Sequence, residues 1–300
     1  MIETAIEFLL KTQNADGGWG SQRGRRSSTE STALAVLALD AAADRSSAPA
    51  LSRGIGWLAE RQNADGSWPL ATDMKEGSWA TALAMLSLAP FEAQRPRALR
   101  GAGWLEGQKG SGLGLFNSLL YRFSSQHRQR NRLNPDLKGW SWTPGAFSWV
   151  EPTSYALIAL KKLRPYLAGK ADERIRQGEL MIYDRMCQGG GWNYGNSRVL
   201  GEDLWPYPDI TALALIALQD HETAEANQRS LATLRKMLGQ NGSGLTLSWS
   251  ILCFSLYDQD VAEWRKTLAA NHAKTGFLGE TKTMALALLA MTDGPKVFRV

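Results

Sequence analysis

The sequence predicts an all-α protein, a single-domain (α/α)6 toroid built from six helical hairpins. Two observations lead to this prediction: a heptapeptide repeats along the chain, and amphipathic segments alternate with segments that are apolar on nearly every side. The 300 residues, of which 44% are hydrophobic and 21% charged, allow one large core. Because neighbouring repeats share their core, we expect one domain over residues 1–300, with a long insertion at residues 108–150.

The repeated heptapeptide marks the turn inside each hairpin. QNADGGW at residues 13–19 returns as QNADGSW at residues 62–68, and shorter copies are QGGGW at 188–192 and QNGSG at 240–244. Each copy follows an amphipathic segment and precedes one rich in alanine and leucine. Glycine after the first helix suits a left-handed helix end, and the tryptophan ring can pack back across the hairpin. We therefore expect Trp19, Trp68 and Trp192 to be structural.

The two kinds of segment predict two layers of helices. The amphipathic segments, expected outside, cover residues 5–12, 51–61, 97–106, 173–186, 230–238 and 261–270. The apolar segments, expected inside, cover residues 32–39, 81–88, 154–160, 211–218, 249–256 and 284–291. Similar helices in strict alternation bury the inner set by closing into a ring. All outer-to-inner loops then emerge at one end, and the long loops among them mark that end as the functional mouth.

Acidic residues stand at the starts of three inner helices. Superposing the inner segments on their alanine- and leucine-rich cores gives one equivalent position in each, occupied by Glu30, Trp79, Glu151, Asp209, Leu247 and Lys282. An acid at a helix N-terminus stabilises the helix, so a capping role is sufficient to explain each carboxylate taken singly. Three carboxylates at one level of an apolar cavity repel one another and lose solvation, which raises the pKa. We therefore predict that Glu30, Glu151 and Asp209 are catalytic and that at least one is protonated near neutral pH.

Basic and aromatic residues gather in the loops at the predicted mouth. Arg23, Arg25 and Arg26 precede Glu30, and guanidinium groups suit the phosphates of a diphosphate lipid or an anionic membrane surface. A solvated loop is the alternative interpretation. The insertion adds Arg122, His127, Arg128, Arg130 and Arg132, beside an amphipathic segment at residues 115–123. Aromatic faces stabilise cations and also stack on sugars. The aromatic candidates for substrate binding are Trp79, Trp149, Tyr155, Trp205 and Tyr207.

The repeated turns resemble the QW motif of the terpenoid cyclase and prenyltransferase toroid superfamily, especially squalene–hopene cyclases. In class II cyclases of that family, the middle aspartate of DxDDTA protonates a polyprenyl double bond or epoxide. STESTA at residues 28–33 falls on this frame and places Glu30 at the donor position, with Ser28 and Ser31 in place of the flanking acids. YPDITA at residues 207–212 likewise keeps Asp209 and lacks both flanking acids.

The resemblance predicts no metal or cofactor. The protein prenyltransferase branch binds zinc through Asp, Cys and His, but Cys187 and Cys253 have no histidine in a recognisable arrangement beside them. His221 and His272 lie near predicted helix ends, where solvated or capping roles are the simpler interpretation. We therefore exclude the zinc-binding branch on sequence grounds.

The expected function is a terpenoid-cyclase-like protein that takes an isoprenoid or other hydrophobic small molecule into a central cavity and cyclises or isomerises it by protonation from Glu30 or Asp209. The incomplete DxDD motif favours the first alternative, a non-catalytic lipid-binding or interaction toroid. The second is a carbohydrate-active (α/α)6 enzyme with paired carboxylates among aromatic rings. The chain has no apolar run near the ~20 residues of a membrane span. The N-terminus lacks a basic start followed by a small-residue cleavage site, so we expect a cytoplasmic protein, with peripheral membrane contact as a further expectation. A net charge of only +5 predicts no nucleic-acid partner.

Overall fold

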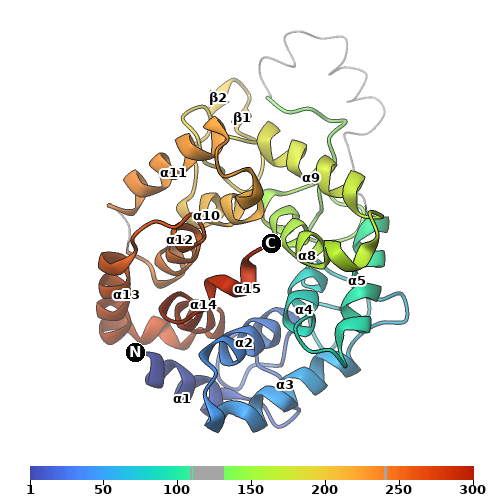
Figure 1. Ribbon diagram of the computed structural model, residues 1–300, viewed down its shortest axis with the longest axis vertical. Coiled ribbons are helices and arrows are strands. Elements are labelled where there is room, and N and C mark those ends of the chain that lie inside the picture. The colour runs from blue at the N-terminus through green and yellow to red at the C-terminus, as the bar shows by residue number, and fades with distance from the viewer. Residues whose placement is uncertain (109, 111–131, 240–241) are drawn as a thin grey trace.

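The computed structural model describes residues 1–108, 110, 132–239 and 242–300, which form two concentric rings of helices (Figure 1). The outer ring consists of α1 (Ile2–Thr12), α3 (Ala48–Glu60), α5 (Arg95–Gly107), α9 (Asp172–Asp184), α11 (Glu225–Leu238) and α13 (Ala262–Thr275). The inner ring consists of α2 (Thr29–Ala42), α4 (Thr81–Leu88), α8 (Val150–Leu167), α10 (Pro208–Ala217), α12 (Gly244–Leu256) and α14 (Thr281–Met291). Each inner helix packs against the next, and α14 packs against α2. The ring is closed, and the predicted (α/α)6 toroid is confirmed.

Hydrophobic patterning explains the two layers. Every residue of α4 is buried, as expected for a helix that is apolar on all sides and has neighbours all round. The outer helix α1 buries Ala5, Leu9 and Thr12 instead, which lie three and four residues apart and therefore share one face. The third inner helix is longer than the predicted 154–160, because Lys161 and Lys162 continue it with hydrogen-bonding partners inside the protein.

The tryptophans of the repeated turns are the packing residues that the sequence predicts. Trp19 is fully buried, and its indole Nε1–H donates to the carbonyl of Leu9 at 2.8 Å. Its backbone N–H donates to the hydroxyl of Thr32 at 3.0 Å, so one residue connects α1 to α2. Trp68 repeats both bonds in the next hairpin. Gly17, at φ +90°, adopts the left-handed conformation that this turn requires.

A further copy of this turn escaped the sequence comparison. Trp140 donates its indole N–H to Leu105 at 2.9 Å and its backbone N–H to the Thr153 hydroxyl at 2.8 Å, which are the bonds of Trp19 in the third hairpin. The sequence does contain a signal for this copy: Trp140 precedes Thr153 by thirteen residues, as Trp19 precedes Thr32. The weak copy at 240–244 begins outside the described residues.

A short C-terminal helix, α15 (Pro295–Phe298), enters the ring near its centre (Figure 1). The sequence analysis assigned no role to this segment. Phe298 is fully buried, and its ring centroid lies 5.4 Å from that of Trp249 on α12. Lys162 donates to the carbonyls of Lys296 and Arg299, and Gln219 donates to that of Phe298. These contacts fix the segment inside the toroid.

The remaining elements are short and lie in the connections. The strands β1 (Arg198–Val199) and β2 (Glu202–Asp203) pair antiparallel between α9 and α10. Three 3-10 turns, η1 (Arg45–Ser47), η2 (Gln219–His221) and η3 (Gly276–Gly279), complete the described chain. Within the described ranges, no helix combines the length and the apolar character that crossing a membrane requires.

Candidate active site at the mouth

Charged residues from three inner-helix starts meet at the mouth of the toroid. The ammonium Nζ of Lys282 lies 2.9 Å from Oε1 of Glu30 and 3.6 Å from Oε1 of Glu151. Lys282 and Glu30 begin the neighbouring helices α14 and α2, whereas Glu151 begins α8 on the other side of the ring. The Lys282–Glu151 ion pair therefore spans the barrel axis.

Glu151 has a strongly raised pKa. Its carboxyl group is buried, and the pKa rises from 4.5 to about 7, chiefly because burial penalises the charged form. The ammonium of Lys282 opposes this rise, and the neighbouring carboxylates of Glu30 and Asp209 contribute to it. A large share of Glu151 is therefore protonated at neutral pH. The sequence predicted such a shift for the group of acids without identifying the residue.

Lys282 remains charged despite its burial. Burial alone lowers the pKa of an ammonium group, but the surrounding Tyr155, Glu30 and Glu151 raise that of Lys282 well above its usual value. Its positive charge offsets the repulsion between the acids that the sequence predicted. In the superposed inner segments, Lys282 occupies the position equivalent to Glu30 and Glu151. That equivalence indicated that it lies at the mouth, but the sequence predicted no role for it.

The third acid lies at the same end of the toroid. Asp209 begins α10, and its Oδ2 accepts a hydrogen bond of 3.5 Å from the hydroxyl of Tyr194. Burial and the charge of Asp209 raise the pKa of Tyr194 to about 12, so this tyrosine stays a hydrogen-bond donor. Its ring lies 5.7 Å from that of Tyr207, one of the predicted aromatic residues. Tyr194 itself was missed because nothing in the sequence shows that its loop folds back toward Asp209.

Aromatic side chains fill the barrel axis below the charged cluster. Tyr155 lies one turn after Glu151 and is fully buried, and its ring stacks on Trp79 at 5.5 Å and meets Trp249 at 6.0 Å. The same series of rings continues to Phe298 of α15. The hydroxyl of Tyr155 has no hydrogen-bond partner within the described residues. Trp79 and Tyr155, both predicted to bind substrate, thus lie inside the barrel.

The other predicted binding residues are exposed around the mouth. Trp205 is 84% exposed, and Trp149 and Tyr207 are also accessible to solvent. Arg23, Arg25 and Arg26 are exposed, and Arg26 forms an ion pair with Asp73 at 3.1 Å. Within the described residues, none of the three arginines forms an ion pair with Glu30, Glu151 or Asp209. Arg132 is exposed, whereas Arg122, His127, Arg128, Arg130 and the segment 115–123 lie outside the described residues.

The serines that replace the flanking acids of the DxDD frame have structural roles. The hydroxyl of Ser28 accepts from the backbone N–H of Ser31 at 3.2 Å and caps α2. Ser31 is buried at the start of that helix. Neither serine forms a hydrogen bond with Glu30 in the described residues, so Lys282 is the polar partner of that acid.

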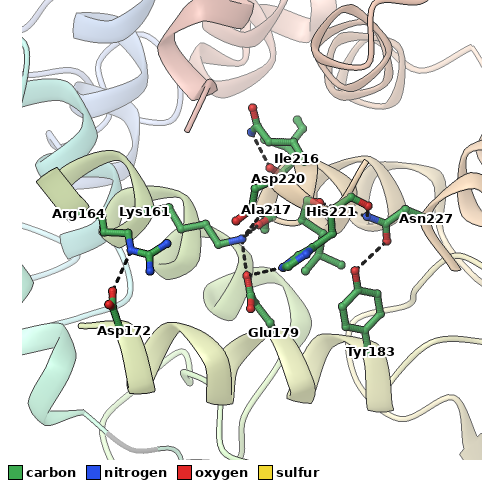
Figure 2. Close-up of polar contacts among 12 residues, drawn as sticks. Lys161, Arg164, Asp172, Glu179, Tyr183, Ile216, Ala217, Asp220, His221 and Asn227 are labelled. Atoms are coloured by element: carbon green, nitrogen blue, oxygen red, sulfur yellow. Dashed lines mark hydrogen bonds and ion pairs between the residues drawn. The ribbon is translucent and has the colours of Figure 1, made fainter. Parts of the chain in front are cut away.

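A second charged cluster lies at the opposite end of α8 (Figure 2). Glu179, Asp220 and His221 are close enough together to suggest a metal site. The buried ammonium of Lys161 lies 2.6 Å from Glu179 and 2.5 Å from Asp220, between the two carboxylates. That cation offsets one of the two negative charges and joins α8, α9 and η2. The imidazole Nε2 of His221 lies 3.1 Å from Oε1 of Glu179.

Comparisons with known proteins support the family resemblance. Residues 1–78, which contain both complete QW copies and Glu30, match the family described as the squalene-hopene cyclase C-terminal domain. No curated protein matches the chain. A variant of the type II terpene cyclase MstE from Scytonema, in complex with its substrate geranylgeranyl dihydroxybenzoate, is 15% identical. It is similar over 99% of this chain and 97% of its own, with a TM-score of 0.60.

Two carbohydrate-related structures are as similar in fold. An alpha-amylase from Clostridium perfringens is 11% identical over 97% of both chains, with a TM-score of 0.63. An inactive variant of an alpha-1,6-mannanase from Salegentibacter, in complex with alpha-1,6-mannotriose, is 10% identical over 99% of this chain and 98% of its own, with a TM-score of 0.61. At these identities the likeness shows the fold alone. In motif and fold together, the chain resembles the terpenoid cyclase and prenyltransferase toroid superfamily.

Proposed function

We propose that this protein binds a polyprenyl or other hydrophobic small molecule at the mouth and cyclises or isomerises it by protonation, with Glu151 as the proton donor. The observation that carries this proposal is the buried Glu151 carboxyl, with a pKa of about 7, at the meeting point of the inner-helix starts. An acid with this pKa is about half protonated at pH 7, so the protonated form is available to donate its proton to a bound substrate.

The neighbouring residues have complementary roles in this proposal. Lys282 and Glu30 hold the Glu151 side chain near the axis, and Lys282 stabilises the carboxylate that remains after proton transfer. Asp209, paired with Tyr194, is the second acid and can accept the proton that leaves the product cation. A proton thus passes from Glu151 to a double bond or epoxide, and the resulting cation loses a proton to a base.

The proposed substrate-binding residues are the aromatic and basic side chains around the mouth. Trp149, Trp205 and Tyr207 present accessible aromatic faces at the mouth, and such faces stabilise a carbocation or cover an apolar chain. Trp79 and Tyr155, which are buried, form the aromatic floor beneath the charged cluster. Arg23, Arg25 and Arg26 are proposed to attract an anionic end of the substrate or an anionic lipid surface.

The comparison with MstE supports this substrate class. That cyclase binds geranylgeranyl dihydroxybenzoate, a molecule with a long isoprenoid chain, and nearly the whole of its length corresponds to this chain. A single toroid of this length is therefore sufficient for a protein described as a type II terpene cyclase.

A second candidate function is carbohydrate hydrolysis. Exposed aromatic rings next to a carboxylate are suited to stacking on sugars, and Tyr207 lies beside Tyr194, which donates to Asp209. Two of the similar structures are an amylase and a mannanase. The QW turns and the family match favour the terpenoid interpretation.

The deciding experiment combines ligand identification with one substitution. We expect mass spectrometry of the purified protein to detect a copurifying isoprenoid, and geranylgeraniol and its epoxide to be converted by the parent protein. Glu151→Gln should abolish turnover while keeping the fold and ligand uptake, and Glu30→Gln should reduce it. Glu202→Gln, an exposed acid on β2, is the matched control and should retain full activity.

The alternatives give different results in the same experiment. Ligand uptake without turnover in the parent protein would identify a non-catalytic binding toroid. Release of sugars from mannose or glucose oligomers, lost in the Asp209→Asn variant, would establish the carbohydrate function instead.

A further inference from the structure

A pocket of about 440 Å³ lies at the end of the toroid opposite the mouth. It is formed by the last turns of α2, α4 and α8, by Arg95 at the start of α5, and by residues 293–297 of the C-terminal segment. We call it the rear pocket. Its volume falls in the range of about 300–1,000 Å³ that is typical of small-molecule sites.

The inner wall of the rear pocket is apolar. Leu37, Leu86 and Leu163 come from three successive inner helices, and Val297 of α15 faces the same space. Tyr166, which also lines the pocket, is 54% exposed, so the pocket reaches solvent at its rim. The three leucines are only 1–2% exposed, so the apolar surface open to a ligand comes mainly from Tyr166 and Val297. An alkyl chain entering here would cover that surface and leave water.

Two cations of the rear pocket have no acidic partner. Lys162 donates to the carbonyls of Lys296 and Arg299, both at 3.0 Å, which leaves one N–H of its ammonium unused. Burial lowers the pKa of Lys162, so a nearby negative charge would relieve the cost of its charged form. Arg95 lies over the ring of Tyr166 at 5.0 Å and donates one N–H to Ala89. Neither forms an ion pair within the described chain.

The charged side chains that line the rear pocket favour a ligand with one negative charge. The lining carries three basic side chains, Arg95, Lys162 and Lys296, and two acidic ones, Asp40 and Asp293. Asp293 is paired with Lys296 at 2.6 Å, and burial raises the pKa of Asp40. The lining therefore carries one more basic than acidic side chain, which matches a ligand with a single negative charge. A phosphate dianion would bring two negative charges to a site that already holds two carboxylates.

We propose that the rear pocket binds an amphipathic monocarboxylate, with its alkyl chain along the apolar lining and its carboxylate facing Lys162 and Arg95. This site is separate from the acid cluster at the mouth. None of its residues belongs to the proposed active site, so either proposal can fail without the other.

Calorimetric titration with decanoate tests the proposal directly. The parent protein should bind one decanoate, and decyltrimethylammonium, with the same chain and the opposite charge, should not compete. Arg95→Gln should weaken decanoate binding by at least about tenfold, since a charge-assisted hydrogen bond is lost. Ala41→Trp should abolish binding by filling the pocket without changing a charge. Lys236→Gln, an exposed lysine on α11, should leave the affinity unchanged.

Three results would overturn the proposal. The first is no decanoate binding by the parent protein. The second is unchanged affinity in a folded Ala41→Trp variant. The third is loss of binding in Trp205→Ala, which would place the fatty chain at the mouth. Circular dichroism of each variant establishes that it is folded, and Glu151→Gln should bind decanoate as the parent does.

Discussion

Lys282 and Glu151 form an ion pair across the barrel, with Nζ and Oε1 3.6 Å apart although their helices lie on opposite sides of the ring. Glu30 shares the same ammonium at 2.9 Å. One partly buried cation thus faces two carboxylates, and Asp209 adds a further negative charge near Glu151. Burial, together with this negative charge, is why the Glu151 carboxyl keeps its proton to about pH 7.

The pH dependence of stability should change in Glu151→Gln. The folded state has the higher pKa, about 7 against an ordinary 4.5, so it retains a proton that the unfolded state releases between these values. The contribution of Glu151 to stability is therefore lost as the pH rises through this window, by roughly 3 kcal/mol. Urea unfolding between pH 4 and pH 8 should show a flatter profile in Glu151→Gln. Glu202→Gln should retain the parent slope, and identical profiles for all three proteins would contradict the buried site.

Removing the shared cation should destabilise the protein strongly. Lys282→Met leaves Glu30 and Glu151 without a counterion, and breaking a buried pair in this way costs about 3–5 kcal/mol. The loss should be larger at pH 8 than at pH 5, where Glu151 is protonated. Adding Glu30→Gln to Lys282→Met should restore part of the stability. A change below about 1 kcal/mol at pH 8 would show that the cluster is solvated instead.

The tryptophan of the third hairpin should matter as much as those of the complete QW copies. Trp140→Ala, Trp19→Ala and Trp68→Ala each remove a buried ring and should cost about 3–5 kcal/mol. Trp205→Ala is the matched control, since an exposed ring should contribute less than about 0.5 kcal/mol. Melting temperatures measured by circular dichroism provide the comparison. An unchanged melting temperature in Trp140→Ala would remove it from the set of packing residues.

The exposed arginines should control binding to anions. Replacing Arg23, Arg25 and Arg26 together by serine should weaken binding to diphosphate ligands or phosphatidylglycerol vesicles, while the fold is preserved. Sedimentation with vesicles over a salt titration measures the effect, which should fade as salt screens the charges. A control variant changes exposed lysines of the outer helices, namely Lys11, Lys266 and Lys274. Equal binding by both variants and the parent would exclude a specific role for the arginine loop.

Local sequence signals were sufficient for the fold. Helix-period patterns in α1 and all-round apolar patterns in α4 report directly on how many sides of a helix are buried, so they predict the two layers. The fixed hairpin period then predicts ring closure. The copy at Trp140 was missed because the insertion before it hides the period, although the spacing to Thr153 is unchanged.

The candidate site was predictable only in part. Superposition of the inner segments placed Glu30, Glu151 and Asp209 at one level, because equivalent positions in a repeat occupy equivalent heights in a ring. It did not predict that Lys282 reaches across the axis, since the reach of a side chain depends on the diameter of the ring and on what else fills it. The entry of α15 and Phe298 was unpredictable for a similar reason: a four-residue helix has no periodicity to detect.

The sequence by itself determined the all-α class, the order of the hairpins, the QW turns and the end of the toroid where the acids gather. These properties depend on contacts between residues close in the chain or on a repeated spacing. The tertiary structure alone decided which acid is buried enough to hold a proton, which cation balances it, and which rings and pockets occupy the two ends of the barrel. Those properties depend on distances across the ring, where Glu151 and Lys282 are far apart in sequence and their energies are set by burial and charge at a few ångströms.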